Sequence, residues 1–222
     1  MKFRIDLKII LFFILFYFTK QIEIYALMTI FDIIHEIAHL IAGIMLKMKP
    51  DKLEIIPFGV RISFDLETKD YNRKIQKGNL LDIKKIIVAI SGPAINFIIA
   101  ICTYYFKINL YLKELIIYSN ILLAVFNLLP IYPLDGGRIV KSIFDIMIGR
   151  RKAEKYINII SFISVMILTA ISSIIIIYIN NIAIFLIIVF LWLIYLKEDL
   201  RYRRRENIYN LLDKSLEIKL NK

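Results

Sequence analysis

The only two histidines of this chain lie four residues apart, with an acidic residue between them. His35, Glu36 and His39 form the pattern H-E-x-x-H inside a segment that is otherwise apolar. Residues four apart share one face of a helix, so both imidazoles can bind one Zn²⁺ ion while the adjacent carboxylate serves as a base for water. Ionisable groups inside a membrane are costly and commonly functional, which favours a metal site over a buried polar pair in a helix bundle.

Two histidines leave a catalytic zinc ion short of one ligand, because such sites use three protein ligands and a water. A carboxylate must supply the third, and Asp135 is the candidate. It follows Asn127, Pro130 and Pro133 at the end of an apolar run, and Gly136-Gly137 come directly after it. Prolines break helices and glycines permit turns, so we expect irregular backbone at membrane depth, lining a cavity or buried in protein. An ordinary helix stop before a cytoplasmic loop is the alternative.

The composition indicates a membrane protein in which charge is confined to loops. Apolar residues make up 59% of the 222, the mean hydropathy is +0.68, and charged residues are still 22%. The single cysteine, Cys102, excludes an intramolecular disulfide framework and a cysteine-rich zinc site. We therefore predict an all-α polytopic membrane protein.

Six apolar segments have the length and character of transmembrane helices, for which roughly 20 residues are needed. They form one membrane domain over residues 1–200, followed by a basic cytoplasmic tail, 201–222, that suits an anionic lipid surface. The predicted spans are 3–19, 22–46, 86–106, 115–134, 156–178 and 182–196.

The basic residues predict the orientation of these spans. If both termini are cytoplasmic, the inside segments hold 27 of the 30 Lys and Arg residues, and only Lys20, Lys107 and Lys113 lie outside. Such a bias is typical of cytoplasmic loops in membrane proteins. It accounts for the net charge of +11 without a nucleic-acid partner.

Three further features have a structural and a functional interpretation. Residues 53–65 combine a turn signal with strand-like alternation, so we expect a short membrane-associated β-hairpin that either pairs with an unwound substrate or lies at the surface. Asp32 could accept a hydrogen bond from an imidazole or face a water path. Asn96 follows Gly92-Pro93 and could act in the site, although helix packing is the simpler role.

Taken together, these motifs resemble the site-2 proteases, which are intramembrane zinc metalloproteases. The resemblance rests on three elements in family order: His35-Glu36-x-x-His39, Ser91-Gly92-Pro93-Ala94-Ile95-Asn96, and Asn127-x-x-Pro130-x-x-x-x-Asp135-Gly136. It implies one Zn²⁺ per chain on His35, His39 and Asp135, with Glu36 as the base. It also implies that Asn127 lines the active site and that the hairpin dips into the membrane beside it. An interhelical hydrogen bond is the alternative role for Asn127.

The layout most resembles the branch of stage IV sporulation protein FB. That likeness implies a bacterial cell membrane, a pro-sigma factor as substrate, regulated intramembrane proteolysis and membrane inhibitor proteins as partners. Many members of the branch carry a CBS domain; we expect none here, because too few residues follow Leu196. We also expect no PDZ domain, because the sequence shows no PDZ-like insertion.

The sequence thus predicts a zinc metalloendopeptidase (class EC 3.4.24) that cuts a membrane-associated protein near the cytoplasmic face. A membrane zinc or proton transporter is the main alternative, since transporters also place His and Asp inside helices. A non-catalytic regulatory homologue is another. Cobalt or iron would accept the same ligands as zinc.

Overall fold

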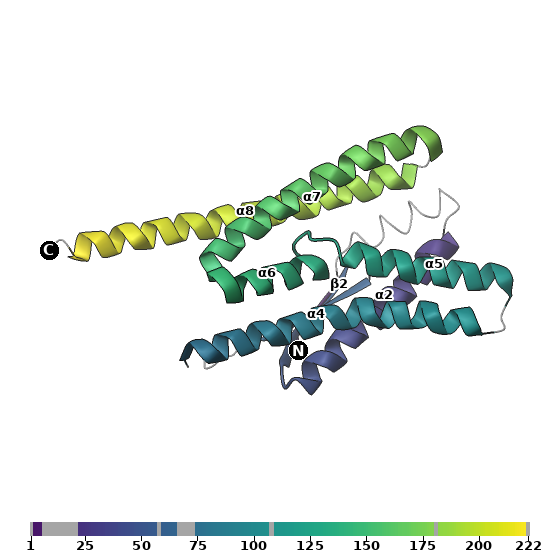
Figure 1. Ribbon diagram of the computed structural model, residues 1–222, viewed down its shortest axis with the longest axis horizontal. Coiled ribbons are helices and arrows are strands. Elements are labelled where there is room, and N and C mark those ends of the chain that lie inside the picture. The colour runs from purple at the N-terminus through teal and green to yellow at the C-terminus, as the bar shows by residue number, and fades with distance from the viewer. Residues whose placement is uncertain are drawn as a thin grey trace. The chain divides into compact units, whose positions relative to one another are not determined.

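The computed structural model describes residues 2–5, 22–56, 59–65, 74–106, 109–179 and 182–220. The chain divides into two compact units, Met1–Leu129 and Pro130–Lys222. Figure 1 labels most of the elements. In the first unit they are β1 (Lys2–Ile5), α2 (Ile22–Met45), β2 (Lys49–Ile56), β3 (Gly59–Asp65), α4 (Lys74–Tyr105) and α5 (Leu110–Asn127); in the second they are α6 (Asp135–Ile148), α7 (Arg150–Ile179) and α8 (Ile182–Leu220).

Helix α2 has one face for lipid and one for protein. Five isoleucines spaced three or four residues apart are exposed, as expected of a lipid-facing stripe: Ile30, Ile33, Ile37, Ile41 and Ile44. The opposite stripe has a spacing of four and is buried: Phe31, His35, His39 and Gly43. The helical period therefore directs both imidazoles inward.

The C-terminus of α2 is capped by backbone hydrogen bonds. Lys47 has a φ of 60°, and Met48 N donates to Gly43 O at 2.9 Å while Lys47 N donates to Ile44 O at 2.9 Å. This is the Schellman arrangement, with a lysine in the left-handed position that glycine usually takes. It reverses the chain directly into β2, and so places the sheet beside the helix that carries the histidines.

The sheet has three strands in the order β1-β2-β3. Strands β2 and β3 pair antiparallel, with Glu54 opposite Arg61 and Ile56 opposite Gly59, and a register shift lies between Pro50 and Lys52. Strand β1 pairs parallel to β2. The antiparallel pair corresponds to the strands predicted over 53–65, whereas β1 was not predicted.

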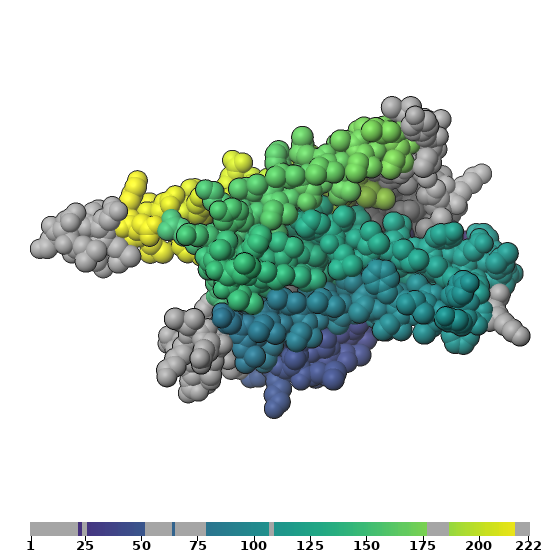
Figure 2. Space-filling view, viewed as in Figure 1, coloured from purple at the N-terminus to yellow at the C-terminus, as the bar shows by residue number. Residues whose placement is uncertain are grey.

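Helices α4 and α5 run side by side and pack along their length (Figures 1 and 2). The inward stripe of α4 consists of small and polar residues, including Ala89, Gly92, Pro93, Asn96 and Ala100. Small residues let helix backbones approach closely in an apolar setting. Helix α2 packs against both of them. The histidines are therefore held in a layer of three helices.

The second unit consists of α6, α7 and α8, which pack in sequence order. Helix α8 continues through the predicted tail as one helix and is tied to α7 there by Arg205–Glu154 at 3.1 Å and Arg151–Asp213 at 2.7 Å. Deeper along the pair, Asn158 Nδ2 donates to Asp199 Oδ1 at 2.9 Å. The basic segment is thus helical over the residues the structure describes.

Four helices are long and apolar enough to cross a membrane, judged over the described residues: Ala26–Met45, Asn79–Tyr105, Leu110–Asn127 and Arg150–Ile176. They correspond to the predicted spans 22–46, 86–106, 115–134 and 156–178. The prediction of a helix from residue 3 is wrong at its start, because Lys2–Ile5 form β1, and residues 6–19 lie outside the described part. The predicted span 182–196 lies within α8 but is not among the four, so a total of six spans stays a prediction.

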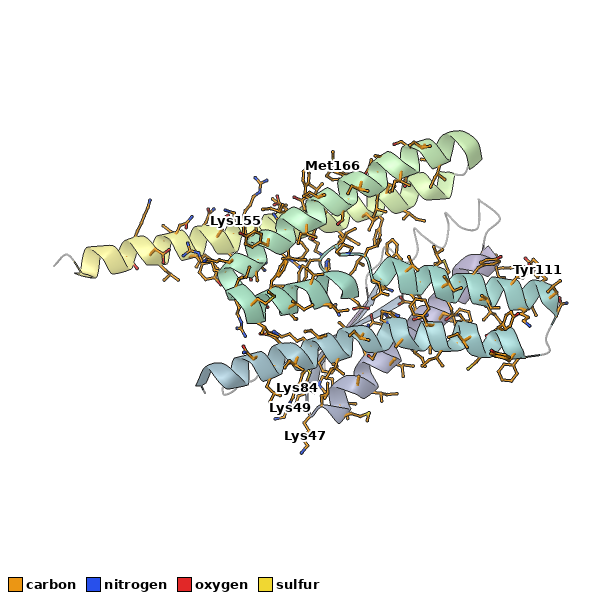
Figure 3. The ribbon with its side chains drawn as sticks, in the orientation of Figure 1. Lys47, Lys49, Lys84, Tyr111, Lys155 and Met166 are labelled. Carbon is orange, nitrogen blue, oxygen red and sulfur yellow. The ribbon has the colours of Figure 1, made fainter. Side chains whose placement is uncertain are left out.

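Three lysines of the first unit lie together at one end. Lys47 and Lys49 follow α2, and Lys84 lies in the first half of α4; Figure 3 shows the three close together, with Tyr111 of α5 at the opposite end of the unit. These three lysines lie at the end of the helices that the sequence predicts to be cytoplasmic.

Candidate metal centre

The two histidines face each other on the inward side of α2. His35 and His39 are only 1% and 2% exposed, and their Nε2 atoms are 3.1 Å apart. The ring planes are nearly perpendicular, at 89°. The nitrogens of both rings are therefore directed toward one small region of space, as a shared cation requires.

A backbone carbonyl fixes the ring of His39. Its Nδ1 lies 2.6 Å from Val88 O, and Ser91 Oγ, 3.2 Å from the same nitrogen, donates to that carbonyl at 2.7 Å. A carbonyl oxygen can only accept, so His39 Nδ1 carries the proton and Nε2 presents its lone pair. This is the tautomer that a metal ligand needs.

An amide holds His35 in the same way. Its Nδ1 lies 2.6 Å from Asn96 Oδ1, and Asn96 is fully buried on α4. The two Nδ1 acceptors are thus Asn96 and Val88, both on α4. Helix packing is not the sole role of Asn96, because its side chain contacts an imidazole directly.

Gly92 keeps the space beside the two Nε2 atoms open. A Cβ atom at this position would lie 2.5 Å from His35 Nε2 and 2.5 Å from His39 Nε2. Two imidazole nitrogens with only a glycine beside them are donors that suit a zinc ion, which needs one further protein ligand. The two histidines therefore fit the metal as two of its three protein ligands.

Two acidic residues lie near the histidines on α2. Glu36 and Asp32 are both half-buried, and each has interactions with its surroundings. Glu36 follows His35 directly, so it lies about 100° around the helix from the buried stripe. That position sets it at the border between the protein-facing and lipid-facing sides.

Asp135 lies in the second unit, where it is the first residue of α6 and is buried. A carboxylate is favourable at a helix N-terminus because of the helix dipole. Arg138 Nη1 lies 3.4 Å from its Oδ1. The predicted irregular backbone is present over residues 128–134, but it ends one residue before Asp135, since Asp135, Gly136 and Gly137 are helical.

Gly137, the second glycine after Asp135, serves close packing rather than a turn. A Cβ on Gly137 would lie 2.5 Å from the backbone atoms Ile131 C and Tyr132 N. The loop before α6 therefore folds tightly onto the first turn of the helix. Glycine is required there because no side chain fits beneath that loop.

Asn127 is the last residue of α5, and its amide donates to Leu123 O one turn earlier at 3.2 Å. The predicted span 115–134 therefore ends as a helix at Asn127, before the two prolines. Its part in the active site stays a prediction, because this local bond is one that any helical asparagine can make.

Three features of the site were not predicted from the sequence. They are the carbonyl of Val88, the open space that Gly92 leaves beside the two Nε2 atoms, and Asn120, whose Oδ1 accepts a hydrogen bond from Asn96. Asn120 could have been found as a lone amide within an apolar helix, since polar side chains there commonly bond across helices. The role of the Val88 carbonyl could not have been predicted from the sequence, because every residue carries a backbone carbonyl.

The profile of Peptidase family M50 matches residues 23–113 and 107–171. Zinc metalloprotease MJ0392 of Methanocaldococcus jannaschii is 30% identical over 142 residues, which are 60% of this chain and 37% of that protein. Stage IV sporulation protein FB of Bacillus subtilis is 24% identical over 127 residues, 55% of this chain and 41% of that protein. The match thus spans about two fifths of each of these relatives.

A solved structure, Site-2 Protease from Methanocaldococcus jannaschii, is similar with a TM-score of 0.65 and 22% sequence identity. The similarity covers 89% of this chain and 91% of that one. At this level of identity the likeness shows a shared fold.

Proposed function

The chain belongs to peptidase family M50, the site-2 proteases, and on that premise we propose that it is an intramembrane zinc metalloendopeptidase. Its substrate is a membrane-associated protein, cut near the cytoplasmic face.

One observation carries the proposal. His35 and His39 turn their Nε2 atoms toward each other at 3.1 Å while Asn96 and Val88 accept from their Nδ1 atoms at 2.6 Å. With both Nδ1 atoms protonated, two lone pairs meet at one point, an arrangement that a cation stabilises. A structural pair of buried histidines would gain more from one imidazole donating to the other.

Asp135 would supply the third ligand. Its carboxylate is the donor type that completes a site of two histidines. The family motif Asn127-x-x-Pro130-x-x-x-x-Asp135-Gly136 assigns it this role. Zinc held by these residues would provide Lewis-acid activation of water and of the scissile carbonyl.

The other residues act on protons and on the substrate. Glu36 accepts the proton of the attacking water and delivers it to the leaving amine, the general acid–base role of a carboxylate next to a metal site. Asn127 donates from its amide to the oxygen that becomes negative as the carbonyl is attacked. It must release Leu123 O to do so, which costs a single weak local bond.

The sheet offers a place to hold an unwound substrate. A helical substrate must be extended before cleavage, and strand addition to a free sheet edge would stabilise the extended form. Strand β3 is one of the two edge strands, and its Phe64 ring occupies the space in front of Gly43, one turn after His39 on α2. The hairpin would thus guide the substrate along the metal-binding helix.

The charge distribution supports cytoplasmic termini, and the similarity to stage IV sporulation protein FB suggests a pro-sigma factor as the substrate class. Membrane inhibitor proteins would then be the natural regulators.

The test compares wild type with Glu36→Gln in lipid vesicles that contain a membrane-tethered pro-sigma factor, with the product read by its size. The substitution keeps the shape of the side chain and removes the base, so we expect product from wild type only and equal zinc content in both. Equal product would overturn the proposed role of Glu36. Zinc entry into the vesicles with both proteins would instead identify a transporter.

A further inference from the structure

A line of buried hydrogen bonds leads from the backbone of α5 to the imidazole of His35. Asn120 Nδ2 donates to Ile116 O at 2.9 Å, Asn96 Nδ2 donates to Asn120 Oδ1 at 3.0 Å, and Asn96 Oδ1 lies 2.6 Å from His35 Nδ1. Asn96 and Asn120 are 0% exposed. The line crosses three helices, α5, α4 and α2.

The carbonyl at its far end determines the direction of every bond. Ile116 O can only accept, so Asn120 must direct its NH₂ group there and its oxygen toward Asn96. Asn96 then directs its NH₂ group to that oxygen and its own oxygen to His35, whose Nδ1 must carry the proton. Rotating either amide by half a turn would place two acceptors or two donors together, and an unsatisfied buried polar group costs about 1–3 kcal/mol.

The two histidines differ in how their tautomer is secured. His39 bonds to the carbonyl of Val88, which cannot exchange donor for acceptor. His35 bonds to an amide, which presents a donor instead if it rotates. Among the residues that the structure describes, it is the bond from Asn96 Nδ2 to Asn120 Oδ1 that decides between these two orientations. A donor facing His35 Nδ1 would select the tautomer with the proton on Nε2, which cannot bind a metal through that atom.

We propose that Asn120 is a positioning residue for the candidate metal centre: through Asn96 it selects the tautomer of His35 that leaves Nε2 available as a ligand. The consequence for zinc rests on the proposed function, whereas the consequence for the tautomer does not. Asn120 touches neither a metal ligand nor a substrate in this scheme, so its effect is transmitted entirely by the orientation of one amide.

The first experiment measures the tautomer without metal. Nitrogen NMR of the metal-free protein, labelled at histidine, contains two imidazoles, and a His39→Gln variant assigns them. We expect His35 to be protonated on Nδ1 in wild type and to shift toward Nε2 in Asn120→Leu. The zinc affinity of that variant should fall about 10- to 100-fold, as is usual when the partner that orients a metal-bound histidine is lost.

A matched control removes a buried polar group that is not part of this line. Thr103 lies on α4, is buried, and donates to Ile99 O at 2.7 Å. Thr103→Val should leave both the tautomer of His35 and the zinc affinity as in wild type. An equal loss in Thr103→Val and Asn120→Leu would mean that any buried polar deletion disturbs the site, and would overturn the proposal.

A second test uses a variant in which the tautomer of His35 no longer depends on Asn120. In Asn96→Asp both carboxylate oxygens accept, so His35 Nδ1 finds an acceptor whichever way the group is turned. Adding Asn120→Leu should then cost little further zinc affinity. The same fold loss in both backgrounds would show that Asn120 acts by packing alone.

The outcomes separate the two proposals. An unchanged tautomer in Asn120→Leu overturns the role of Asn120 while the Glu36→Gln result still stands. A wild-type protein that binds no zinc overturns the proposed function, while the metal-free spectra still decide whether Asn120 sets the tautomer.

Discussion

The clearance at Gly92 yields the sharpest test of where the metal binds. In Gly92→Ala the new Cβ would lie 2.5 Å from His35 Nε2 and from His39 Nε2, whereas ordinary contacts begin at 3.4 Å. Each nitrogen must therefore retreat by about 0.9 Å, far more than the ±0.2 Å that metal-ligand distances tolerate.

The surroundings limit how this overlap can be relieved. Moving α4 away from α2 would carry Val88 O and Asn96 Oδ1 with it and lengthen the two hydrogen bonds of 2.6 Å that hold the imidazoles. Overpacking in a well-packed interior costs about 1–3 kcal/mol. If that cost falls on the metal-bound state, zinc affinity drops about 5- to 150-fold. Alanine also favours the helix by about 0.8–1 kcal/mol over glycine, so folding itself should not suffer to the same extent.

The assay is zinc affinity by competition with a chelator, in wild type, Gly92→Ala and Gly43→Ala. Gly43 is a matched control on α2, because the three atoms nearest to its added Cβ all belong to the far end of the Phe64 ring, which can swing aside. We expect a large loss for Gly92→Ala and a small one for Gly43→Ala. Wild-type affinity in Gly92→Ala would refute a metal site between the two Nε2 atoms.

Three further changes test other parts of the proposals. Asp135→Asn should lower zinc affinity about 10-fold or more through the loss of a ligand charge, and full zinc content would remove Asp135 from the site. Asn127→Ala should reduce kcat about 10²- to 10³-fold with zinc retained, and unchanged kcat would assign it to helix packing. Burial raises the pKa of Tyr202 above its usual value of 10.0, and the hydrogen bond to Glu206 acts in the same direction. Because the folded state holds this proton more tightly, the stabilisation is present below pH 10.0 and is lost as the pH rises further. Helix content followed by circular dichroism should therefore fall less at alkaline pH in Tyr202→Phe, and identical titrations would contradict this.

Local patterns predicted much of the first unit. The spacing of His35 and His39 placed both imidazoles on one face of α2 because the helical period is a property of the chain itself. The turn signal and alternation over 53–65 predicted two paired strands for a similar reason, since both are encoded by neighbouring residues. The parallel strand β1 was not predicted, because its pairing partner lies about fifty residues away.

The helix break at Pro130 and Pro133 was predicted correctly, whereas the turn expected at the two glycines after Asp135 was wrong. Glycine is compatible with a turn and with close backbone packing, and the residue type does not distinguish them. The structure uses Gly137 for packing inside α6, which makes Asp135 a helix N-terminal residue. The cause is the loop at Ile131 and Tyr132, which folds back over that first turn.

By itself, the sequence determined that two imidazoles and a carboxylate share an apolar helix, which is enough to predict a metal and a reaction class. The tertiary structure alone decided what holds those imidazoles. Val88 contributes a carbonyl that is chemically identical to every other carbonyl in the chain, and Asn96 and Asn120 come from different helices. Helix period acts within a segment, whereas a hydrogen-bond partner is chosen by which helices pack together and at which depth.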